Sequence, residues 1–176
     1  MKNIVLISFV LISLLISSCS SLIYFTEEIR DELYENDLDI EMVQFYNSDK
    51  IILKRNLSKA EMQIAKGTIR LENGQYFEEI IIPKKTKGVA VKLGAKYLKV
   101  AFEEGENRNL RFDINENSKY QISADSWYNN YGSIKYDTTV YYIVPGSNKI
   151  MLLVNKEYFS NFEKQIRIVK GRSVGR

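Results

Sequence analysis

The sequence contains no histidine, one cysteine and two prolines among its 176 residues. The absence of histidine excludes a Ser-His-Asp or Cys-His catalytic set and a metal site that depends on histidine ligands. A single cysteine excludes an intramolecular disulfide and a cysteine-rich zinc site. We therefore expect neither a metal nor a cofactor. Apolar residues make up 45% of the chain, which is enough for one packed domain.

The N-terminus has the organisation of an export signal. Met1-Lys2-Asn3 carries a positive charge, and Ile4 to Ile16 form a hydrophobic run that only two serines interrupt. This run has the length of the apolar part of a signal peptide, and it is shorter than the roughly 20 residues that a transmembrane helix needs. The pattern predicts that residues 1–18 are a cleaved signal peptide.

The hydrophobic run ends in Ile16-Ser17-Ser18-Cys19. This sequence resembles the bacterial lipobox, in which an aliphatic residue and two small residues precede a cysteine. The resemblance implies that the Cys19 thiol receives a diacylglycerol, that cleavage occurs before it, and that the new amine is acylated. Two or three acyl chains anchor a protein stably to a bilayer. The alternative is an ordinary secretory signal followed by a chance cysteine.

The lipobox implies a location in the bacterial cell envelope, with the membrane as a partner through the lipid on Cys19. Ser20 and Ser21 follow the cysteine, and no Asp stands at the second mature position. By resemblance to enterobacterial sorting, this favours the outer membrane. It leaves open whether the protein faces the periplasm or the cell surface.

Charge divides the rest of the chain into an acidic and a basic part. Residues 20–41 hold eight acidic side chains and one arginine, for a net charge of −7, whereas residues 42–176 carry a net charge of +9. The basic part has three interpretations: it faces anionic lipid, it binds an acidic polymer, or it is a solvated sheet surface. No run resembles a nucleic-acid motif, so we expect no nucleic-acid partner.

The acidic segment has the spacing of an amphipathic helix. Phe25, Ile29 and Leu33 recur every four residues, and Thr26 stands where an N-cap is expected. The alternatives are a solvated spacer or, by resemblance to some Bacteroidetes lipoproteins, an acidic sorting signal for the cell surface. We describe residues 19–40 as the lipidated cysteine followed by an acidic tether or short helix.

Residues 41–170 have the pattern of one all-β domain, and 171–176 that of a basic tail. Short apolar segments alternate with turn signals about 8–12 residues apart, which is typical of antiparallel sheets. The pattern predicts a β-sandwich or a partly closed barrel of roughly ten strands. It does not distinguish between the two.

Individual turns can also be predicted. Asn73-Gly74 is the strongest hairpin signal, because a type I′ turn needs positive φ at both central residues. Ile40 to Tyr46 is expected to form the first strand. Lys135 to Val144 and Lys149 to Lys156 are expected to pair as a hairpin, since a Pro-Gly turn lies between them.

One polar, aromatic segment, 125–133, is the best candidate for a contact site and is expected to form a loop. Aromatic faces stack on sugar rings or peptide side chains, and amides supply adaptable hydrogen bonds. The alternative is that the tryptophan and one tyrosine plug the core. The candidate ligand-binding residues are Trp127, Tyr128, Asn129, Asn130 and Tyr131, and we expect Tyr136, Tyr141 and Tyr142 on the next strand to extend this surface.

Carboxylates are the remaining candidates for acid–base chemistry. A glycosidase needs two of them on either side of the scissile bond. Glu103, Glu104 and Glu106 are expected in a turn, and Asp113 is expected on the next strand. This arrangement can bring their carboxylates close together. Charged turns are common solvated features, however, and we assign no catalytic residue.

These observations lead to one main hypothesis and two alternatives. The main hypothesis is a non-enzymatic cell-envelope lipoprotein whose β domain binds a partner protein or a glycan. The first alternative is a carboxylate-based glycan hydrolase, and the second is a purely structural envelope lipoprotein. Beyond the lipobox, no motif identifies a family.

Overall fold

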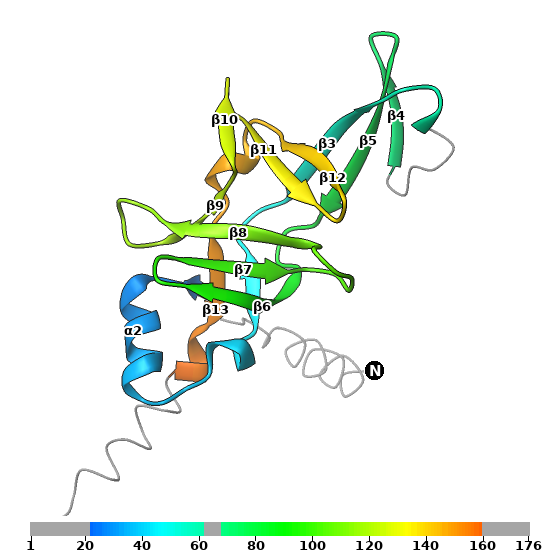
Figure 1. The fold of residues 1–176 in the computed structure, drawn as a ribbon. Coiled ribbons are helices and arrows are strands. Elements are labelled where there is room, and N and C mark those ends of the chain that lie inside the picture. The colour runs from blue at the N-terminus through cyan, green and yellow to red at the C-terminus, as the bar shows by residue number, and fades with distance from the viewer. Residues whose placement is uncertain (1–21, 62–67, 160–176) are drawn as a thin grey trace, which may run out of the picture. The chain divides into compact units, whose positions relative to one another are not determined.

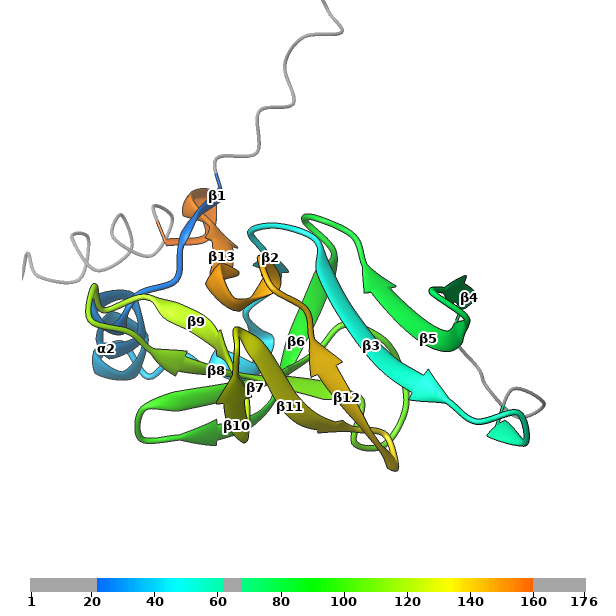
Figure 2. The ribbon, with the colours of Figure 1, turned by 90° about the horizontal axis from the view of Figure 1, so that it is seen from above.

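The computed structural model describes residues 22–61 and 68–159. The fold divides into two compact units, residues 23–154 and the flanking segments 1–22 and 155–176. The first unit carries the features discussed below. It consists of two antiparallel sheets of seven and six strands in a sandwich-like arrangement that is not a closed barrel (Figures 1 and 2). The all-β prediction is confirmed, and the sandwich is the form adopted.

The seven-stranded sheet has the order β1-β13-β2-β6-β7-β8-β9. Successive side chains of a strand point to opposite faces, so alternate residues of β7 and β8, such as Leu98 and Phe112, are fully buried. The strands are β1 Leu22–Tyr24, β2 Phe45–Asn47, β6 Lys87–Gly94, β7 Tyr97–Ala101, β8 Asn109–Ile114, β9 Tyr120–Ser123 and β13 Leu152–Asn155.

The six-stranded sheet has the order β10-β11-β12-β3-β5-β4. Strands β11 and β12 lie over β7 and β8 of the other sheet (Figures 1 and 2). Leu53, Ile134 and Ile143 are buried on the inner face of this sheet. The strands are β3 Ile51–Leu57, β4 Thr68–Glu72, β5 Gln75–Ile82, β10 Ser126–Tyr128, β11 Tyr131–Tyr136 and β12 Thr139–Ile143.

The helix expected in the acidic segment is present as α2, Glu27–Glu35. The Thr26 hydroxyl accepts a hydrogen bond from the Ile29 N–H at 3.3 Å, which is the predicted N-cap. Phe25, just before the helix, is buried against the rings of Phe45 and Tyr120. The segment is therefore part of the folded unit from Phe25 onward. Within the described residues, no helix has both the length and the apolar character needed to cross a membrane.

The cap at Thr26 gives a first testable prediction. Thr26→Ala removes the acceptor for the Ile29 N–H, and we expect the free energy of unfolding to fall by about 1 kcal/mol. Thr26→Ser keeps an acceptor at the same position and is expected to leave stability within about 0.5 kcal/mol of the parent. Urea unfolding followed by far-UV circular dichroism measures both. Equal losses in the two variants would show that the cap is not the cause.

The expected first strand, Ile40 to Tyr46, is wrong in its first half. Ile40–Met42 form a 3₁₀ turn, η1, and the strand β2 begins only at Phe45. The turn forms because the Asp39 carboxylate accepts the Glu41 N–H at 2.9 Å, which caps it locally. The sequence signal for this turn is Asp39, an acidic residue that stands directly before Ile40.

The expected hairpin of Lys135–Val144 with Lys149–Lys156 is also wrong. The first segment is two strands, because Asp137 has φ +57° and turns the chain between β11 and β12. β12 then pairs with β3, whereas β13 pairs with β2 in the other sheet. The Pro-Gly turn is followed by a short 3₁₀ turn, η3 (Ser147–Lys149), in a connection that crosses between the sheets.

Candidate functional site

The aromatic segment predicted to be a loop is a tight hairpin. β10 pairs with β11, and Asn129 and Asn130 link them with φ values of +47° and +65°. Asparagine tolerates the left-handed conformation better than most residues, so a two-residue turn of this kind can form without glycine. The aromatic side chains are therefore displayed from a hydrogen-bonded scaffold.

Trp127 does not plug the core. It lies opposite Gly132 across the hairpin and is 42% exposed. A Cβ atom added to Gly132 would lie 2.8 Å from the indole ring, so the absence of a side chain there lets the ring approach the backbone. Trp127 is thus held in place by β11 and remains accessible to a partner.

A hollow of about 310 Å³ lies beside the indole. Its lining contains no charged side chain, and amides dominate it. The Gln121 amide donates to the Asn148 carbonyl at 2.8 Å and accepts from the Asn115 amide at 2.8 Å, which fixes its orientation. The lining residues are Gln121, Ile122, Trp127, Asn129, Asn130 and Asn148.

Three tyrosines share the outer face of the same sheet. Tyr128 and Tyr131 are direct cross-strand partners, and Tyr142 lies opposite Ser133, two residues after Tyr131. Their exposed fractions are 79%, 46% and 47%. Tyr142 therefore extends the aromatic surface, as predicted. Tyr136 and Tyr141 do not extend it, because both are buried on the inner face of the sheet.

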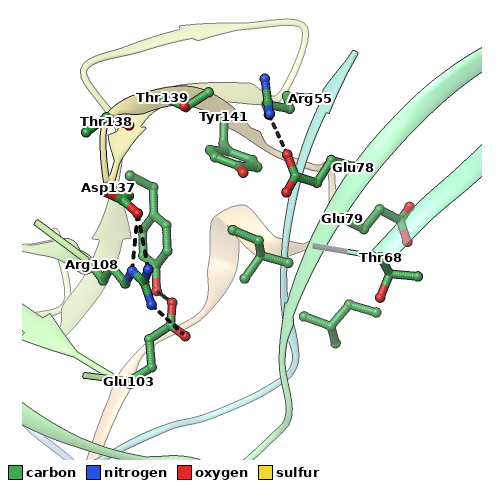
Figure 3. A pocket seen from close by; sticks show the side chains of 13 residues that line it. Arg55, Thr68, Glu78, Glu79, Glu103, Arg108, Asp137, Thr138, Thr139 and Tyr141 are labelled. Carbon is green, nitrogen blue, oxygen red and sulfur yellow. Dashed lines mark hydrogen bonds and ion pairs between the residues drawn. The ribbon is translucent and has the colours of Figure 1, made fainter. Parts of the chain in front are cut away.

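Tyr136 and Tyr141 line a second and larger cavity, a cleft of about 660 Å³ (Figure 3). This cleft was not predicted from the sequence. Two arginines, four carboxylates, two tyrosines and three threonines contribute to its walls. The lining residues are Arg55, Thr68, Glu78, Glu79, Ile80, Ile81, Glu103, Arg108, Tyr136, Asp137, Thr138, Thr139 and Tyr141.

One wall of the cleft is a network around Tyr136. Its hydroxyl donates to Glu103 Oε1 at 2.7 Å, while the Arg108 guanidinium donates to Asp137 Oδ2 at 3.3 Å and lies 3.8 Å from Glu103 (Figure 3). Burial, reinforced by the bond to Glu103, raises the pKa of Tyr136 far above its usual value. The phenol thus stays protonated and acts as a donor, which is unsuitable for a nucleophile.

The facing wall is an ion pair between neighbouring strands. Arg55 of β3 and Glu78 of β5 are direct cross-strand partners, with Nε and Oε2 2.6 Å apart. The Glu78 side chain is only 1% exposed, and the Arg55 guanidinium lies 5.5 Å from the centre of the Tyr141 ring. Burial, followed by the interaction with Glu78, raises the pKa of Tyr141.

The acids considered for hydrolysis do not gather in the cleft. Glu103 lines it, but Glu104, Glu106 and Asp113 do not. Asp113 is bonded to Arg111 on β8 at 2.8 Å. Within residues 22–61 and 68–159, no group of acidic residues or cysteine is arranged to hold a metal ion. Cys19, the predicted lipidation site, lies outside the described residues.

The structure thus gathers Trp127, Asn129 and Asn130 around one hollow and places Tyr128 and Tyr131 on the opposite face of the hairpin. The cleft was missed because its charged residues come from separate strands and each resembles a solvated side chain.

Comparison of the chain with protein families, with curated proteins and with solved structures found no match.

Proposed function

We propose that this chain is a non-enzymatic lipoprotein of the bacterial cell envelope whose β domain binds a partner protein through the β10–β11 hairpin. The observation that carries the proposal is the exposure of Trp127, Tyr128 and Tyr131 on a tight hairpin instead of in the core. Tyr128 and Tyr131 form one aromatic face with Tyr142, while Trp127 lies on the other face of the hairpin, and exposed apolar patches of this kind are typical of interaction sites. Tyrosine and tryptophan are enriched in such sites because they supply contact area at low entropic cost.

The shape of the hairpin favours a protein over a glycan. A small ligand needs a concave site that buries most of its surface. Tyr128 stands next to the hairpin turn with 79% of its surface exposed, so it can enter a recess in a partner. The amide-lined hollow beside Trp127 is suited to receive a polar side chain in return. The hydrogen-bonded turn also lowers the entropic cost of ordering the contact surface.

The lipobox supplies the other half of the proposal. Ser20 and Ser21 alone separate Cys19 from β1 in the sequence. Because an extended residue spans at most about 3.6 Å, a lipid on Cys19 would hold β1 within about 10–15 Å of its attachment point. A short tether of this kind favours partners that also lie at the membrane, since their local concentration is high.

Co-purification from the native host tests the hairpin. The lipidated protein is crosslinked in cells and purified through a tag placed after Arg176. We expect a discrete protein partner, and Tyr128→Ser combined with Tyr131→Ser is expected to lower its recovery at least tenfold, since aromatic anchors carry most of the energy of an interface. Both side chains are exposed, so the domain should melt at the parent temperature.

Tyr34 offers a matched control for this experiment. It is a tyrosine of similar exposure, 50%, on α2 and outside the hairpin. Tyr34→Ser is expected to retain the partner at the parent level. Equal recovery of the partner by the hairpin variant and the parent would remove the proposal, as would equal loss in the hairpin variant and the Tyr34 variant.

A further inference from the structure

Polar side chains replace aliphatic ones at several neighbouring positions on the inner face of the six-stranded sheet. On β3, the inward residues Ile51 and Leu53 are followed by Arg55. On β5, Glu78 occupies the position opposite Arg55. A charged pair on two adjacent strands thus interrupts an otherwise aliphatic inner face, which resumes on β3 at the buried Leu57.

The strands β11 and β12 make a similar change, but one residue pair apart, since Tyr141 lies opposite Ile134 and Tyr136 opposite Thr139. Ile134 and Ile143 are buried aliphatic residues, and the next inward positions are Tyr136 and Tyr141. Thr139, opposite Tyr136, completes the polar layer. Coordinated departures from the apolar pattern of a core are expected at functional sites, where folding and function make different demands.

The polar layer is costly to maintain. Arg55 and Glu78 are 14% and 1% exposed, and removing two charges from water cancels much of their mutual attraction. Apolar residues of similar volume in such positions are often as stabilising or more so. Stability alone therefore does not account for an ion pair here, and a ligand that uses these groups does.

The cleft has the dimensions of a ligand site. Its volume of about 660 Å³ lies within the range of about 300–1,000 Å³ found for small-molecule pockets. A hydrogen bond within each wall fixes the side chains before any ligand binds. Tyr136 donates to Glu103 in one wall, and Arg55 donates to Glu78 in the other. A pre-formed site reduces the entropic cost of binding.

The groups in the cleft determine which ligand chemistry fits. Both guanidiniums already pair with carboxylates, and the lining holds four carboxylates against two arginines, which disfavours an anion. A simple cation would use the carboxylates and leave the guanidinium and threonine donors without a role. A hydroxyl group donates and accepts at once, as this mixture of groups requires. The rings of Tyr136 and Tyr141 add apolar surface for C–H groups.

We propose that this cleft is a binding site for a neutral saccharide, with Arg55, Glu78, Glu103 and Arg108 as the hydrogen-bonding groups. The site is independent of the hairpin that we propose as a protein-binding surface. A glycan array probed with the full-length lipidated protein in detergent tests it. The array carries neutral, acidic and amino-substituted glycans, so that each competing ligand class is represented.

The decisive variant is Arg55→Met combined with Glu78→Leu, which replaces the ion pair with apolar side chains of similar size. We expect the parent to retain at least one neutral glycan and the double variant to bind it at least tenfold more weakly. Should the double variant fail to fold, Thr139→Val serves instead, because it removes one hydroxyl with little change of shape, and a loss of about threefold is expected.

Tyr128→Ser is the control, and it is expected to retain the glycan fully because Tyr128 is not in the cleft. The proposal is overturned if no neutral glycan is retained, if only charged glycans are, or if the folded cleft variants bind like the parent. Loss of glycan in the Tyr128 variant alone would assign the saccharide to the hairpin. A Tyr128 variant that loses the protein partner and retains the glycan would support two separate sites, the hairpin for the protein and the cleft for the saccharide.

Discussion

Replacing Arg55 alone with Met is expected to lower the free energy of unfolding by about 3–5 kcal/mol. The change removes the guanidinium that lies 2.6 Å from the Glu78 carboxylate, and Glu78 is 1% exposed. A buried carboxylate that loses its cation keeps the full cost of desolvation. Urea unfolding followed by far-UV circular dichroism measures the loss.

Adding Glu78→Leu to this variant is expected to restore stability to within about 1 kcal/mol of the parent or above it, because no buried charge then remains. The control is a pair whose cation is exposed and whose carboxylate has a second cation. Arg70 is 54% exposed and lies 2.7 Å from Glu79, which is also 3.7 Å from Lys54 Nζ. Arg70→Met is therefore expected to cost at most about 1 kcal/mol. If the double variant is as unstable as the single one, the ion pair holds the fold together, and the reason for inferring a ligand is lost.

Cys19→Ala is expected to move the protein from the membrane fraction to the soluble fraction almost completely. Each buried methylene of an acyl chain contributes about 0.8 kcal/mol, so losing two or three chains removes the anchor. Metabolic labelling with a palmitate analogue should likewise fall to background. The measurement is made in a host that processes lipoproteins, with the full leader present.

Ser18→Ala is the matched control for this variant. It keeps a small residue just before Cys19, so the lipobox pattern is retained and both labelling and membrane association are expected to stay at the parent level. An unlabelled parent protein, or a Cys19→Ala protein that remains with the membrane, would contradict the lipidation claim. In the second case a protein contact would have to hold the chain there.

The fold was most predictable where one local interaction determines the conformation. Asn73 and Gly74 adopt φ values of +49° and +78° in the hairpin between β4 and β5, as a type I′ turn requires. Thr26 caps α2 because its hydroxyl reaches a nearby N–H. In both cases the decisive contact lies within four residues, so the sequence contains all of the information.

Prediction failed where a contact between distant strands decides the structure. Asn129-Asn130 is a weaker turn signal than Asn-Gly, and three-residue β10 forms because β11 is already paired with β12. β12 pairs with β3, nearly ninety residues earlier in the sequence, and no pattern along the chain indicates that partner. The exposure of Trp127, Tyr128 and Tyr131 agrees with the sequence-based expectation, but the expected loop is a hairpin.

The cleft shows the same limit for function. An arginine in an alternating strand is usually a solvated side chain, and Arg55 becomes informative only once Glu78 is known to lie opposite it. One clue was available: Arg55 stands two residues after Leu53 and two before Leu57, both on the buried side of β3. A charged residue within an apolar alternation is worth testing as a site.

Site-specific photo-crosslinking from the tip of the hairpin tests the proposed protein-binding surface most directly. A photoreactive amino acid replaces Tyr128 in the lipidated protein and, in a separate strain, Tyr34 on α2. We expect a discrete protein adduct from position 128 and none from position 34, since only the first position faces the partner. No adduct from position 128, or the same adducts from both positions, would contradict the hairpin as a protein-binding surface.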